Sequence, residues 1–183
     1  ITGQSSRTQM NRVTMRTTVK SLASLVGIAL IATVIPAQAA TPTVNATVKA
    51  QLLYLIEEEK LARDVYAALD AVSISPKFKN ISGAEQTHMD YISALLVTYG
   101  IKNPTIGKKA GVFTNKSLAA LYKTLVTKGK KSSIDALQVG ILIEEKDLAD
   151  LATLSKSITQ TDIKTAVAFL KKGSENHLRA FKR

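Results

Sequence analysis

A glutamate and a histidine three residues apart, Glu85 and His88, lie in a segment whose apolar residues repeat with the period of a helix. Residues three, four and seven apart share a helix face, so both fall on the stripe that carries Ile81, Ile92 and Leu95. In a protein core, a carboxylate or an imidazole is costly unless it pairs, hydrogen-bonds or binds a metal. The Glu-x-x-His spacing is also one by which helical bundles present ligands to a pair of metal ions.

Four long helices are predicted from apolar periodicity and from helix-end signals. They span about residues 48–71, a stretch from a cap at Asn80 or Ser82 to about Tyr99, about residues 133–154, and a stretch that begins after Thr159, Thr161 or Asp162 and runs towards Phe181. Gly100 is expected to end the second helix, because glycine readily adopts the left-handed conformation that follows many helix ends.

The connection between the second and third long helices contains Pro104, Gly107 and Gly111, with a short helix expected from Ser117 to Thr127. It is too long for a simple hairpin between two helices. A single long crossover can run the length of a bundle and keeps the two helices that it joins parallel. The sequence therefore predicts an all-α fold, a ferritin-like four-helix bundle over residues 48–183 with a short extra helix in its crossover.

The inward stripes of the four helices carry polar groups that an apolar core would not select. These are Glu59, Glu85, His88, Glu144, Asp147 and His177. Glu57 and Glu58 are expected to point progressively away from the core, beside Glu59. Buried carboxylates repel one another unless they share protons or a cation, so the set is interpreted as metal ligands. The alternative is a proton-sharing structural network without a reactive metal.

The ligand types favour two iron ions, with manganese as the second choice, because oxygen-rich sites with little imidazole suit these metals better than zinc. Di-metal bundles use one Glu from each of two helices and a Glu-x-x-His from each of the other two. The fourth helix departs from this pattern, because Ser174 stands three residues before His177. Asp147 is expected to supply the missing carboxylate, since it shares a face with Glu144. No organic cofactor is indicated.

The first 39 residues contain four basic residues, no acidic ones and an apolar run from Leu25 to Ile35 that is followed by Ala37, Gln38 and Ala39. This pattern is typical of a signal peptide cleaved after Ala39, and the apolar run is too short to span a bilayer. We therefore expect an exported protein, periplasmic or extracellular, without a membrane span after cleavage. Residues 40–47 are expected to form a flexible lead before the bundle.

The chain has a formal net charge of +11 and no cysteine. The lack of cysteine excludes disulfides, thiolate zinc sites, iron–sulfur clusters and cysteine nucleophiles within these residues. A basic surface favours anionic partners. Sparse aromatic residues and the lack of clustered arginines argue against specific nucleic-acid binding. Assembly into a homo-oligomer is compatible with the sequence.

Four segments carry specific motifs: residues 57–66 (EEEKLARDVY), 80–89 (NISGAEQTHM), 143–147 (IEEKD) and 176–181 (NHLRAF). With these motifs the chain resembles the bacterial ferritin-like domain of unknown function 2202, over essentially all residues after 39. The resemblance implies a ferritin-like bundle and no particular reaction. More distantly, the pattern of Glu59, Ala62 and Tyr66 and the pair Glu144 and Asp147 are similar to the first and third helices of rubrerythrins. Ser174 and the lack of a cysteine-ligated iron site depart from rubrerythrin peroxidases.

The leading hypothesis is an exported di-metal protein that binds Fe(II) and oxidises it with oxygen or peroxide, as a ferroxidase or peroxidase type of oxidoreductase. Glu85 and Glu144 would bridge the metals, and Tyr66 could hydrogen-bond a ligand carboxylate or serve only as a core tyrosine. The terminal ligands would be Glu59, Asp147, His88 and His177. The electron donor is not indicated by the sequence.

Two other functions are considered. The first is a non-catalytic helical module that binds metal, or binds anionic envelope material through its basic surface. The second is a hydrolase that uses Ser174, His177 and Asp147, since Ser174 and His177 share a helix face. The segment around Ser174 lacks the Gly-x-Ser-x-Gly turn that exposes a nucleophilic serine, which argues against the hydrolase.

Overall fold

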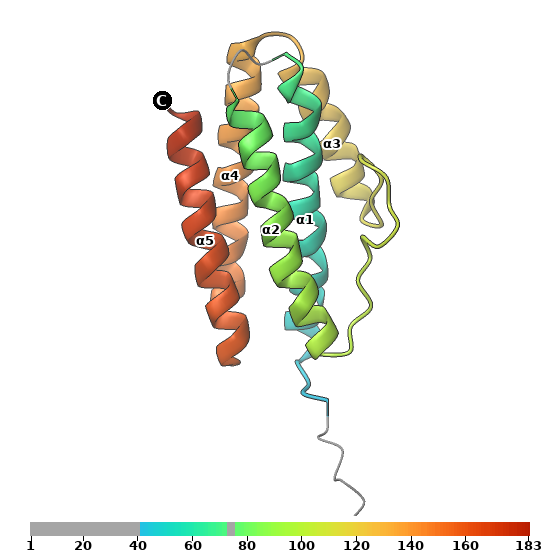
Figure 1. Cartoon of the computed structure of the whole chain (residues 1–183). Helices are drawn as coiled ribbons and strands as arrows, with labels where there is room; N and C mark the ends of the chain where they lie inside the picture. The colour runs from blue at the N-terminus through green and yellow to red at the C-terminus, as the bar shows by residue number, and fades with distance from the viewer. Residues whose placement is uncertain (1–40, 73–75) are drawn as a thin grey trace, which may run out of the picture. The chain divides into compact units, whose positions relative to one another are not determined.

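The computed structural model describes residues 41–72 and 76–183, and these ranges contain five α-helices and no strand. The helices are α1 (Ala46–Asp70), α2 (Lys77–Thr98), α3 (Lys116–Gly129), α4 (Ser133–Ser155) and α5 (Thr161–Phe181) (Figure 1). The predictions of an all-α fold and of a short helix within a long crossover are confirmed. The expected signal peptide and its cleavage site lie outside the described residues. None of the described helices is long and apolar enough to cross a bilayer.

The ends of the first two helices follow from local chemistry. The side chain of Asn45 caps α1 by accepting a hydrogen bond from the backbone N–H of Val48 at 2.8 Å. The expectation that Asn80 or Ser82 caps α2 is wrong, because α2 already begins at Lys77, directly after Pro76. Ser82 instead donates to the carbonyl of Arg63 at 3.0 Å and so links α2 to α1. Gly100, with φ of 62°, follows the end of α2 as expected.

Four of the helices form a closed bundle around one axis (Figure 1). Helix α1 packs against α2 and α4, and α5 packs against α2 and α4, so that α1 and α5 are diagonal to each other, as are α2 and α4. Helix α3 lies outside this ring and packs against α1 and α4. The crossover over residues 99–115 runs along the outside of α1 before it enters α3 (Figure 1).

Two apolar clusters fill the two ends of the bundle. The Val48 cluster is built around Val48, Leu52, Leu96, Leu151, Leu154 and Ile163. The Tyr66 cluster is built around Val65, Tyr66, Leu69, Phe78, Val139 and Phe181. The Val48 cluster contains residues from the starts of α1 and α5 and from the ends of α2 and α4. Helices α2 and α4, which the long crossover connects, therefore run parallel. A layer of buried polar side chains lies between the two clusters.

The outer face of α1 is buried by the crossover. Glu57 accepts hydrogen bonds from the backbone N–H groups of Thr114 and Asn115, the latter at 2.9 Å. The fully buried Lys60 pairs with Asp64 and donates to the carbonyl of Lys109 at 2.9 Å. Glu57 does point away from the bundle axis, yet it is only 3% exposed because the crossover covers it. These contacts fasten the crossover to α1.

Candidate metal centre

All six predicted ligand residues lie in the polar layer between the two apolar clusters, and none is more than 8% exposed. They come from the four helices of the ring: Glu59 from α1, Glu85 and His88 from α2, Glu144 and Asp147 from α4, and His177 from α5. Each helix needs its neighbours to bury this face, since an isolated helix would leave it in water. The layer is therefore a product of the bundle as a whole.

Glu59, Glu85 and His88 form the first half of the centre. The Nδ1 atom of His88 lies 2.8 Å from Glu85 Oε2 and 3.2 Å from Glu59 Oε2. One ligand atom from each of the three residues lies within 4.8 Å of the other two, which is close enough for all three to hold one ion. This half joins α1 to α2.

Glu85, Glu144 and His177 form the second half, with the same 4.8 Å spacing of ligand atoms. The Nδ1 atom of His177 lies 3.0 Å from Glu85 Oε1 and 3.6 Å from Glu144 Oε1. Glu85 therefore belongs to both halves and turns one carboxylate oxygen to each imidazole. The two imidazole rings stack with their centroids 5.4 Å apart.

The hydrogen bonding of these atoms is incomplete, which is unusual for buried polar groups. Within the described residues, the atoms of the polar layer that lack a hydrogen-bond partner are Glu58 Oε2, Glu59 Oε1, Glu85 Oε1, Asp147 Oδ1 and His177 Nδ1. His177 Nδ1 and Glu85 Oε1 are close, but they are not aligned for a hydrogen bond. Close, unpaired oxygen and nitrogen atoms fit ligands directed at a common cation.

Burial and charge pairing set the protonation of the centre. The carboxyl pKa of Glu85 would be raised by burial, but the imidazoles of His177 and His88 lower it to about 2. Burial opposes protonation of the histidines, whereas the neighbouring carboxylates raise the pKa of His88 to about 11 and that of His177 to about 9. In the absence of metal, the neighbouring carboxylates therefore favour the protonated form of both imidazoles. Metal binding has to displace these protons.

The pKa values of the other carboxyl groups of the layer are raised, whereas the pKa of Glu85 is lowered. Burial and the charge of Glu85 raise the pKa of Glu144 to about 7. Burial, followed by the charges of neighbouring carboxylates, raises the pKa of Asp147 well above its usual value, and burial does the same for Glu59. A bound dication would replace the protons that these groups otherwise need.

Asp147 lies beside the two halves and belongs to neither. Its Oδ2 accepts a hydrogen bond from Ser174, while its Oδ1 is buried without a partner. Ser174 also lies 3.0 Å from the carbonyl of Leu170, one turn earlier in α5. His177 faces Glu85 and Glu144, whereas Ser174 donates to Asp147, so the contacts of these two residues differ from the pairing that the hydrolase hypothesis needs.

Glu58 is a member of the polar layer that the helical periodicity missed. It was expected to point away from the core, yet it is 2% exposed, and it lines one narrow space together with Glu59, Glu85, Glu144 and Asp147. Its Oε1 accepts a hydrogen bond from Lys146 at 2.6 Å. Burial, followed by the charge of Asp147, raises the pKa of Glu58 to about 8.

Gly173 of α5 leaves room for the imidazole of His88 because glycine has no side chain. A Cβ atom placed there would lie 2.3 Å from Nε2 of His88 and 2.6 Å from its Cε1. These distances are far below van der Waals contact, so only glycine lets α5 approach the imidazole this closely. The edge of the same ring contacts Phe169, whose centroid is 5.7 Å away.

Tyr66 donates a hydrogen bond to Glu144 Oε1 at 2.6 Å, so its hydroxyl contacts one of the candidate ligand carboxylates. We expect Tyr66→Phe to weaken metal binding by roughly 10-fold, because loss of such an orienting partner costs 10–100-fold in affinity. Competition of Co(II) against a chelator measures this. Tyr99→Phe is the matched control, since Tyr99 donates to Asp162 at 2.8 Å within the Val48 cluster. Equal affinity in both variants would contradict the role of Tyr66.

The fold and this site define an all-α bundle protein whose core holds a candidate metal centre of carboxylates and two histidines. The chain belongs to the family described as uncharacterized protein domain (DUF2202), which matches residues 48–183. The family resemblance seen in the sequence motifs is thereby confirmed.

Two comparisons found similarity to the same protein, MJ0754. The chain is 48% identical over 135 residues to the uncharacterized protein MJ0754 of Methanocaldococcus jannaschii, which covers 74% of this chain and 73% of the relative. It is also similar to the crystal structure of hypothetical protein MJ0754 from Methanococcus jannaschii, with a TM-score of 0.75 and 44% identity over 79% of this chain and 82% of that one. Neither name states an activity, so function is argued from the site.

Proposed function

We propose that this protein is an exported, ferritin-like di-metal protein that binds two iron ions, with manganese as the second choice, and oxidises Fe(II) with oxygen or peroxide. The observation that carries the proposal is the position of Glu85, whose two oxygens lie 2.8 and 3.0 Å from Nδ1 of His88 and of His177. A carboxylate that offers one oxygen to each of two ligand sets is placed to bridge two ions. Export rests on the signal-peptide pattern of the first 39 residues.

Each half of the centre would hold one ion. Glu59 and His88 would hold the first, Glu144 and His177 the second, and Glu85 would be shared. Asp147 has a buried oxygen without a partner and would complete the oxygen-rich ligand set. This donor set of carboxylates with two imidazoles favours iron or manganese over zinc. When bound, such ions supply Lewis acidity and one-electron redox chemistry.

The chain itself contributes orientation and a dry environment. Tyr66 holds Glu144 in place, and Ser174 holds Asp147. The Val48 and Tyr66 clusters close the polar layer at both ends of the bundle. In such a low-dielectric setting, the attraction between a cation and a carboxylate is much stronger than in water.

In the proposed reaction, Fe(II) is the substrate and supplies the electrons that reduce oxygen or peroxide. Two Fe(II) ions release two electrons, and with two protons these reduce oxygen to hydrogen peroxide, or reduce hydrogen peroxide to two water molecules. The sequence contains no cysteine to hold a thiolate-ligated iron site. An electron donor of that kind is therefore excluded within these 183 residues.

Anaerobic loading with Fe(II) tests the proposal. We expect the purified protein to hold two Fe per chain after removal of free iron, and to develop an Fe(III) absorption band on exposure to air or peroxide. Metal retained without oxidation would favour the non-catalytic metal-binding alternative. Failure to retain any metal would contradict the proposal, and the polar layer would then be a proton-sharing structural network.

A further inference from the structure

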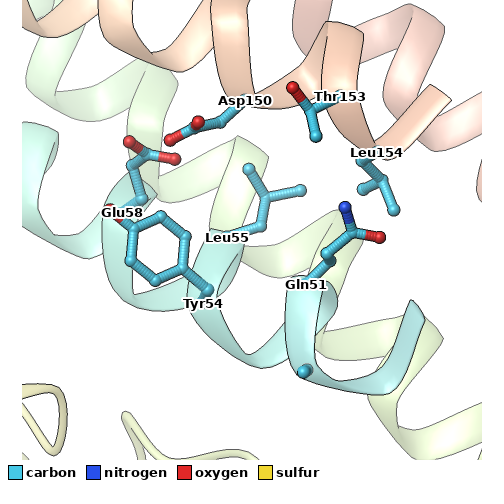
Figure 2. Close-up of a pocket in the computed structure, with 8 residues that line it drawn as sticks. Gln51, Tyr54, Leu55, Glu58, Asp150, Thr153 and Leu154 are labelled. Atoms are coloured by element: carbon cyan, nitrogen blue, oxygen red, sulfur yellow. The ribbon is translucent and has the colours of Figure 1, made fainter. Parts of the chain in front are cut away.

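Glu58 separates the metal centre from a groove on the bundle surface. The groove has a volume of about 330 Å³ and lies between α1 and α4, where Gln51, Tyr54, Leu55, Glu58, Asp150 and Leu154 line it (Figure 2). Glu58 also lines the narrow inner space that contains Glu59, Glu85, Glu144 and Asp147. The same side chain therefore faces both spaces.

The two oxygens of Glu58 have different surroundings. Oε1 accepts a hydrogen bond from the ammonium of Lys146, whereas Oε2 is buried and has no partner among the described residues. An unpaired carboxylate oxygen at this depth costs free energy, and a passing cation would satisfy it. Glu58 lines the groove and the narrow inner space, and its unpaired oxygen makes it a candidate ligand position between them.

Lys146 forms ion pairs with both carboxylates that line this groove. It is 37% exposed, pairs with Glu58 and with Asp150, and donates to the hydroxyl of Tyr54 at 2.8 Å. Figure 2 shows the carboxylates of Glu58 and Asp150 at the same end of the groove. Because a lysine side chain is long and flexible, its ammonium can move into water when a cation takes its place.

Other faces of the centre are less suited to a cation. On the side of α2 and α5, Phe169 covers His88 and stacks on Tyr91 with a centroid distance of 4.2 Å. A second groove of about 230 Å³ also reaches Glu58 and Lys146, but five leucine and isoleucine residues line the rest of it and offer no ligand. The groove between α1 and α4 is lined by two carboxylates, the half-exposed Asp150 and the buried Glu58.

We propose that divalent cations reach the metal centre through the groove between α1 and α4, with Asp150 and Glu58 as transit ligands and Lys146 as the gate that they displace. This inference rests on the proposed metal-binding function. Clefts lined by one sign of charge raise the association rates of oppositely charged ions by roughly 10–1,000-fold. Glu58 should therefore control how fast metal binds, while the six inner ligands control how much is bound.

Stopped-flow binding of Co(II) to the full metal-free chain tests the route, because Co(II) binding is visible by absorption and needs no oxidation. We expect wild-type protein to bind two Co(II). We expect Glu58→Gln to bind two Co(II) at equilibrium, about 10-fold or more slowly. Glu175→Gln is the matched control, since it makes the same charge change at a half-exposed position of α5 and should leave the rate unchanged.

Lys146→Met provides a second measurement that does not depend on the folding of the Glu58 variant. Its binding rate should exceed that of the wild type, because the competing ammonium is gone. An unchanged or slower rate would overturn the gate, and a wild-type rate in Glu58→Gln would overturn the route. If Glu58→Gln binds one Co(II) fewer than the wild type, then Glu58 is a permanent ligand, and its proposed role as a transit ligand is wrong. If the wild type binds no Co(II), both this inference and the proposed function fail.

Discussion

Glu85→Ala is expected to abolish stoichiometric binding of both metal ions, because Glu85 is the one residue that belongs to both halves of the centre. Its two oxygens lie 2.8 and 3.0 Å from the two imidazoles, so no other side chain in the layer duplicates its position. The loss of affinity should exceed the roughly 10–100-fold that follows from removing an orienting partner. Metal analysis after anaerobic loading and removal of free metal measures the effect.

Two further variants serve as comparisons for Glu85→Ala. Glu175→Ala removes a half-exposed carboxylate of α5 and should bind two ions like the wild type. His88→Ala removes a ligand from one half alone and should retain an ion in the half that contains His177. Binding of two ions by Glu85→Ala would show that Glu85 is not a ligand. Equal losses in all three variants would point to a folding defect, which circular dichroism detects independently.

Gly173→Ala is expected to destabilise the protein and to weaken metal binding, although alanine is the better helix former. Within an exposed helix the change would stabilise by about 1 kcal/mol. Here the added Cβ would lie 2.3 Å from Nε2 of His88, in a packed region where overpacking costs about 1–3 kcal/mol. The imidazole has to shift, and its Nδ1 then leaves its place beside Glu59 and Glu85. Thermal unfolding of the metal-free protein, followed by Co(II) titration, measures both effects.

Gly83→Ala is the matched control for this substitution. Gly83 lies within α2, and a Cβ atom there would have no atom within 4 Å outside its own helix and chain neighbours. The control should therefore raise the unfolding temperature through helix propensity alone and leave metal binding unchanged. If Gly173→Ala also raises the unfolding temperature and binds metal normally, then His88 has more room than the packing indicates.

The inward positions of Glu59, Glu85, His88, Glu144, Asp147 and His177 could be predicted from the sequence because they depend on local geometry. Once a segment is helical, the residues that share its apolar face follow from the 3.6-residue period. The burial of all six residues agrees with that reasoning. The long crossover between α2 and α4 was predictable for a similar reason, since its glycines and proline break helical periodicity over a stretch too long for a hairpin.

The burial of the glutamates next to Glu59 could not be predicted from the periodicity of α1 alone. Glu57 and Glu58 follow one another on α1 and both leave the apolar stripe, yet both are buried by other parts of the chain. Glu57 is covered by the crossover through Thr114 and Asn115, and Glu58 is paired with Lys146 of α4. Helical periodicity describes a single helix against one core and does not include a second layer packed on its outer face.

The sequence by itself determined which helical faces carry carboxylates and imidazoles, because side-chain direction along a helix depends only on backbone periodicity. The tertiary structure alone decided how those faces meet: that Glu85 is shared between His88 and His177, that Ser174 holds Asp147, and that Gly173 makes room for an imidazole. These contacts join helices that are far apart in the sequence, and their distances depend on how closely the helices pack. Local periodicity contains no information on that separation.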